Sequence, residues 1–65
     1  MESCDEETMF FRENRESLER RFGGKVVVIK GRKVVAVYEN LATAQREAAR
    51  EFLPGTFLVQ RIERA

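Results

Sequence analysis

The chain has 65 residues, of which 43% are hydrophobic and 35% charged, and its formal net charge is +1. One cysteine and no histidine exclude an intramolecular disulfide framework and a Cys/His metal centre. A chain of this length forms at most one small domain, buries only about 60% of its unfolded surface, and benefits from a partner. No apolar run reaches the length of a membrane span and the first residues are acidic, so we expect a cytoplasmic protein.

The N-terminal part predicts a flexible acidic segment, residues 1–9, before a single domain formed by residues 10–65. From about residue 8 to residue 21 the spacing of apolar side chains predicts a helix that Gly23 and Gly24 end. Its inner stripe would be Phe10 or Phe11, Asn14, Leu18 and Phe22. Asn14 is a good N-cap, so the segment has two interpretations: one continuous helix, or a short turn followed by a helix from Arg15.

Two strand-like runs, residues 25–30 and 33–38, flank Gly31 and Arg32 and predict a β-hairpin. Glycine as the first of two turn residues suits a type II′ turn. This turn would pair Lys30 with Lys33 and would continue without interruption to a Val26–Val37 pair. Because side chains alternate along a strand, one face would carry Val26, Val28, Val35 and Val37, and the other Val27, Ile29, Val34 and Ala36.

Both faces of this hairpin are apolar, whereas a hairpin with one wet face alternates apolar and polar residues. Each face must therefore be covered. Helices of the same chain could cover both faces, or a helix could cover one face and a second subunit the other. A two-stranded ribbon is also marginally stable without a third strand or a packed helix.

The remaining residues predict a second helix and a third strand. Asn40 is a natural N-cap, and the following helix has an apolar face made of Leu41, Ala44, Ala48, Ala49, Phe52 and Leu53, ending before Pro54. Residues 56–62 predict a strand whose Phe57 and Val59 point opposite to Leu58 and Ile62. A crossover helix favours a third strand parallel to the second, which gives an α+β fold of order α-β-β-α-β. The predicted sheet has three strands in the order 2-1-3 and packs with two helices.

This pattern resembles a small bacterial and archaeal domain-of-unknown-function family, family 5678. The matching positions span roughly residues 10–62 and include Phe11, Asn14, Leu18, Phe22, the strand from Gly24 to Ile29, the return strand from Lys33 to Ala36, Asn40, Ala44, Ala48 and residues 57–59. Members often carry Asp or Asn with Gly in the turn, where this chain has Gly31 and Arg32. The resemblance implies a compact α+β module and brings no activity, cofactor or catalytic residue.

The composition argues against an enzyme. There is no histidine, Cys4 stands alone, and Gly23 with Gly24 precedes a strand, whereas phosphate-binding loops follow a strand and open a helix. We therefore expect no catalytic, cofactor-binding or metal-binding residues, no small-molecule ligand and no membrane association.

Two binding functions remain. Apolar residues on both hairpin faces favour a protein-interaction module that self-associates, most simply as a dimer, or binds another protein. Small antitoxins of toxin–antitoxin pairs are comparable at the level of fold analogy. The candidate interface comprises Val26, Val28, Val35, Val37 and Tyr38. The alternative is a nucleic-acid-binding domain with a basic hairpin tip, whose candidate contacts are Arg20, Arg21, Lys25, Lys30, Arg32 and Lys33.

Overall fold

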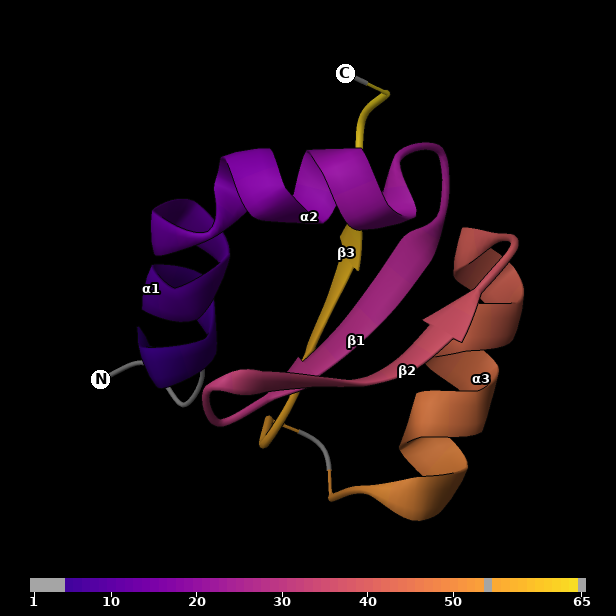
Figure 1. Cartoon of the computed structure of the whole chain (residues 1–65). Helices are drawn as coiled ribbons and strands as arrows, with labels where there is room; N and C mark the ends of the chain where they lie inside the picture. Colours follow the sequence, from indigo (N-terminus) through magenta and orange to yellow (C-terminus); the bar gives the residue numbers. More distant parts are fainter. Residues whose placement is uncertain (1–4, 54, 65) are drawn as a thin grey trace.

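The computed structural model describes residues 5–53 and 55–64, and it confirms the predicted α+β fold (Figure 1). The elements follow the chain as α1 (Asp5–Glu13), α2 (Arg15–Phe22), β1 (Val26–Lys30), β2 (Lys33–Tyr38), α3 (Leu41–Glu51) and β3 (Leu58–Arg61). The three strands form one antiparallel sheet in the order β2-β1-β3, as predicted. Strand β3 is shorter than the predicted range of residues 56–62.

The first helical region consists of two helices that meet at Asn14, so the described residues contain three helices where a continuous first helix would have given two. Asn14 does not cap α2 with its side chain. Its Nδ2 instead donates to the carbonyl of Phe10 at 2.9 Å, at the end of α1. Figure 1 shows that α2 turns sharply away from α1 and crosses above the sheet. Residues 5–9, predicted to be flexible, belong to α1, and residues 1–4 lie outside the described residues.

The hairpin has the predicted register only next to its turn. Lys30 pairs with Lys33 and Ile29 with Val34, but the register then shifts, so that Val28 pairs with Ala36, Val27 with Val37 and Val26 with Tyr38. Val35 is the additional residue of a β-bulge in β2. The turn itself needs glycine, because Gly31 has a φ of +67°.

The bulge corrects the predicted faces of β2. Ala36 packs with the cluster that contains Val26 and Val28, opposite to its predicted face. Val37 is 38% exposed and lies next to residues of α2, also opposite to its predicted face. Val34 and Val35 keep their predicted faces.

Helices of the same chain cover both faces of the sheet, as Figure 1 shows. On one face, α1 and α2 pack over a cluster of Leu18, Val27, Ile29 and Ile62. On the other face, α3 packs over Val26 and Val28 with its buried Ala44 and Ala48. These eight side chains are at most 4% exposed. The third strand contributes to both clusters as predicted, with Leu58 and Ile62 on one side and Phe57 and Val59 on the other.

Helix α3 begins as predicted at a capped N-terminus, where Oδ1 of Asn40 accepts a hydrogen bond from the backbone N–H of Thr43 at 2.8 Å. Three of its six predicted core positions are on the surface: Leu41 is 42% and Leu53 75% exposed, and Ala49 is also exposed. The space at the end of α3 is filled by Phe52, whose ring centroid lies 5.9 Å from that of Phe57. Pro54, the predicted helix stop, lies outside the described residues.

Candidate binding groove

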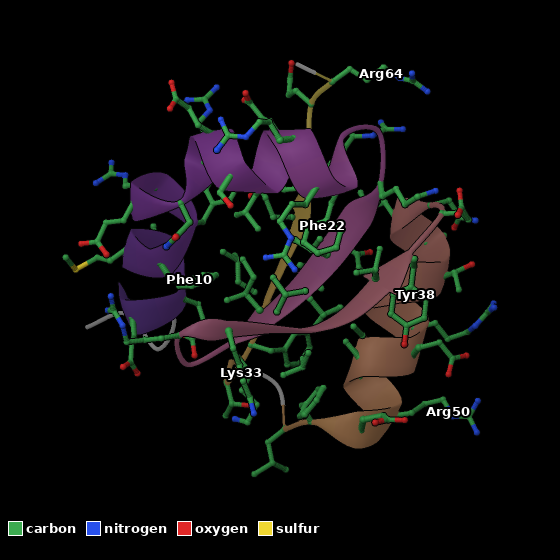
Figure 2. The ribbon with its side chains drawn as sticks, viewed as in Figure 1. Phe10, Phe22, Lys33, Tyr38, Arg50 and Arg64 are labelled. Atoms are coloured by element: carbon green, nitrogen blue, oxygen red, sulfur yellow. The ribbon has the colours of Figure 1, made fainter. Side chains whose placement is uncertain are left out.

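A groove of about 400 Å³ lies between the two N-terminal helices and β2. Its lining residues come from α1, α2 and the hairpin: Phe10, Asn14, Ser17, Leu18, Arg21, Phe22 and residues 32–37. The base of the groove is apolar, since Phe10, Phe22 and Val34 pack against the buried cluster below it. Figure 2 shows Phe22 between α2 and β2, and Phe10 beside α1.

The α2 wall of the groove follows from helical spacing. Ser17 and Arg21 are four residues apart and therefore lie one above the other on the same side of α2. Ser17 has a short side chain, which leaves space beside Leu18 that a larger residue would fill. The groove therefore exists where α2 presents a small residue to the sheet.

The opposite wall is the edge strand of the sheet. The strand order places β2 at one edge, and its neighbour on the other side is β1. Every residue from Arg32 to Val37 lines the groove. Successive side chains of a strand point to opposite faces, so a lining made of consecutive residues means that the backbone edge itself borders the groove. An edge strand presents N–H and C=O groups that can pair with a further strand.

Three basic residues are among those that line the groove. Arg21 and Lys33 make no ion pair with any carboxylate of the described residues. The guanidinium carbon of Arg21 lies 5.3 Å from the ring centroid of its neighbour Phe22. The third cation, Arg32, is paired with Glu13, with 3.1 Å between Nη2 and Oε1.

The structure disperses the predicted nucleic-acid contacts. Arg21, Arg32 and Lys33 line the groove, and Arg20 is exposed on α2. Lys25 lies at the open end of the hairpin, where its Nζ is 2.7 Å from Oε2 of Glu39. Nζ of Lys30 donates to the carbonyl of Thr56 at 3.3 Å and lies 5.7 Å from the ring centroid of Phe52. The six cations therefore do not form one basic hairpin tip.

The predicted protein interface is also divided. Val26 and Val28 have no exposed surface, because α3 covers them, so the prediction that they contact a partner is wrong for the folded chain. Val35 and Tyr38 are half-buried on the same face as α3. Only Val37 is exposed beside the groove, and the bulge is what turns it there.

Sequence reasoning missed Glu7, which was assigned to the flexible terminus. Its side chain is 6% exposed, and Oε2 accepts a hydrogen bond from the backbone N–H of Gly31 at 2.6 Å. Glu7 thereby holds the hairpin turn against α1. Its position three residues before Phe10 places it on the inner side of α1, but no sequence signal identifies a backbone partner 24 residues away.

Among residues 5–53 and 55–64, no group of three or more His, Cys, Asp or Glu side chains could hold a metal ion. Cys4 lies outside this part of the chain. None of the helices in the described residues is long and apolar enough to cross a membrane. Comparison of the chain with protein-family models, with curated proteins and with solved structures finds no match. The resemblance to family 5678 therefore stays a prediction.

Proposed function

We propose that this chain is a small protein-interaction module that binds a partner through the groove between α2 and β2. The observation that carries this proposal is that the edge strand β2 borders a groove whose base is apolar. The groove lies on the face of the sheet that α1 and α2 cover, whereas α3 packs against the other face. Pairing with an exposed sheet edge is a recurrent way in which proteins bind extended peptides: main-chain hydrogen bonds supply affinity, and neighbouring pockets supply specificity.

The dimensions of the groove suit a short segment of chain. Five residues of β2, from Lys33 to Val37, line it, which corresponds to a length of about 17 Å at roughly 3.4 Å per residue. Its volume of about 400 Å³ also falls within the usual range of binding pockets, roughly 300–1,000 Å³.

The sequence suggested that a second copy could cover an exposed face of the hairpin, but the structure leaves no such face exposed. An uncovered hairpin face would have required a second subunit, but α1 and α2 cover one face and α3 covers the other. The sheet has two edge strands, β2 and β3, and the one that borders the groove is β2, so a second copy that used the groove would pair with β2. Dimer formation therefore stays a prediction, and it competes with a different protein for the same edge.

Nucleic-acid binding is the second candidate function, and it is supported by the three basic residues that line the groove, Arg21, Arg32 and Lys33, although the side chain of Lys33 points to the other face of the sheet. It is supported less well than protein binding, because Lys25 and Arg32 are paired with carboxylates and Lys30 is turned toward Phe52. The groove floor is also formed by side chains that pack into the core, so it offers no row of exposed aromatic rings for base stacking.

Selection from a displayed library of random ten-residue peptides tests the proposal. We expect peptides that bind the unmodified chain and lose binding to Ser17→Trp, which fills the groove, and to Val37→Asp, which replaces an exposed apolar side chain at its edge with a carboxylate. Arg50→Trp, on the exposed side of α3, is the matched control and should retain binding. Circular dichroism of each variant confirms folding. Failure to select any peptide, or selected peptides that bind Ser17→Trp and Val37→Asp undiminished, would contradict the proposal.

A further inference from the structure

The α2–β2 groove has features that define its occupant more closely. We infer that the occupant is an extended, acidic segment of a different protein, which adds to the sheet as a fourth strand beside β2. This inference rests on the proposed binding role of the groove and specifies the chemistry of the partner.

The backbone geometry favours an extended segment over a helix. The groove is bordered by the consecutive residues 32–37, so the free hydrogen-bonding edge of β2 faces into it. An extended segment satisfies this edge with its own N–H and C=O groups, whereas a helix uses those groups internally. Val34 and Val37 line the same wall and can contact apolar side chains of an added strand.

The charges favour carboxylates on both faces of the added strand. Arg21 lies on the α2 side of the sheet, together with Val34. Lys33 precedes Val34 and therefore points to the opposite face, and Figure 2 shows its side chain on the side of β2 away from α2. Neither cation has a carboxylate partner among the described residues. An added strand with acids on alternate faces would place one acid near each cation.

A second copy of the chain fits this chemistry poorly. Residues 33–38 contain one lysine and no acid, so two β2 strands side by side bring no carboxylate to Arg21. The only acid adjoining the strand is Glu39, and it is already paired with Lys25 at 2.7 Å. A nucleic acid fits poorly for another reason, since it has no peptide groups to pair with the edge of β2.

A labelled seven-residue peptide, acetyl-EVTEVTE-amide, tests the inference by fluorescence anisotropy at low salt. Glutamates three positions apart alternate between the two faces of a strand. We expect the peptide acetyl-QVTQVTQ-amide to bind with a Kd about three- to tenfold higher, because one or two exposed ion pairs are lost. The double variant Arg21→Gln, Lys33→Gln should raise the Kd of the acidic peptide by the same factor. The double variant Arg46→Gln, Arg50→Gln on α3 is the matched control and should leave this Kd unchanged.

Strand addition has its own control. Alternate backbone N–H groups of a strand point to opposite edges. We therefore use two N-methylated versions of the acidic peptide: the first blocks the N–H groups on one edge of the peptide strand, and the second blocks those on the other edge. We expect one version to bind at least tenfold more weakly and the other to bind as the parent peptide does. Equal binding of both versions with the parent would overturn the inference.

The outcomes separate this inference from the proposed function. If Ser17→Trp loses peptide binding but the glutamate and glutamine peptides bind the unmodified chain equally well, only the acidic nature of the partner is overturned. If the protein dimerises as its concentration rises, so that light scattering gives twice the monomer mass, and the peptide is displaced at the same time, the acidic partner is overturned in favour of a second copy of the chain. Displacement by an unrelated single-stranded oligonucleotide overturns it in favour of nucleic acid. If both peptides bind Ser17→Trp and Val37→Asp as tightly as the unmodified chain, the proposed function is overturned as well.

Discussion

The two faces of the sheet are built differently, and the difference explains why only one of them has a groove. On the α3 face, Ala44 and Ala48 let a continuous, capped helix of 11 residues lie close to Val26 and Val28. On the other face, two short helices meet at Asn14 and reach the sheet with bulky side chains such as Phe10 and Leu18. Small residues along a helix close an interface, whereas large residues at a few points support the helix and leave space between them.

The largest expected effect tests whether the core beneath the groove is as tightly packed as its burial indicates. Ile29 lies on the grooved face and is fully buried, so Ile29→Ala should lower the free energy of unfolding by about 2–5 kcal/mol. A domain of this size has a total stability of roughly 3–10 kcal/mol, so the variant should be close to unfolded in urea titrations. Val37→Ala, at a 38% exposed position on the same face, is the control. Similar losses for the two variants would show that the grooved face has no tight core.

The next largest effect concerns the attachment of the hairpin turn to α1. Glu7→Ala removes the acceptor of the Gly31 N–H and should cost about 1.5–3 kcal/mol, the usual range for a hydrogen bond to a charged group. Glu7→Gln keeps an acceptor oxygen and should cost less. Hydrogen exchange of the Gly31 amide should accelerate in Glu7→Ala at least tenfold. An unchanged exchange rate would mean that this bond does not anchor the turn in solution.

Enlarging a side chain on each face compares the packing directly. Ala44→Leu should destabilise the chain by about 1–3 kcal/mol, because Ala44 is fully buried and has no space beside it. Ser17→Leu, which points into the groove, should change stability by less than about 0.5 kcal/mol. In thermal unfolding, each kcal/mol corresponds to a shift of the midpoint of about 4–8 °C. The comparison fails if Ser17→Leu is as harmful as Ala44→Leu.

The smallest effect distinguishes two asparagines that look alike in sequence. Asn40→Ala removes the bond to Thr43 and should cost about 1 kcal/mol. Asn14→Ala should cost less than half of that. The carbonyl that its side chain contacts, that of Phe10, also accepts a bond from the backbone N–H of Asn14 at 3.0 Å and keeps that partner. Urea titrations of the two variants measure the difference, and equal losses would indicate that Asn14 also supports the junction of α1 and α2.

Several features of the fold could be predicted because short stretches of sequence determine them. Gly31 marks the hairpin turn, Asn40 marks the start of α3, and the doubly apolar runs of the hairpin require cover on both faces. The strand order 2-1-3 follows as the simplest sheet in which a crossover helix makes strand three parallel to strand two. The bulge at Val35 could not be predicted, because Val35 resembles Val34 and any of these residues could have been the additional one.

The candidate site was predicted only in part. The sequence predicts Arg21, Arg32 and Lys33 as nucleic-acid contacts and Val37 as part of a protein interface, so it assigns these residues to two different functions. Their position around one groove depends on the bulge and on the angle between α1 and α2. Neither feature leaves a local sequence pattern.

The amino-acid sequence by itself determined the elements, their order and the need to enclose the hairpin, since these depend on the conformational preferences of neighbouring residues and on the exclusion of apolar surface from water. Only the tertiary structure decided which side chains meet. Glu7 binds Gly31, Ala36 and Val37 exchange faces, and an open edge strand faces α2, because each of these contacts joins residues that are distant in the chain and depends on the packing of the whole domain.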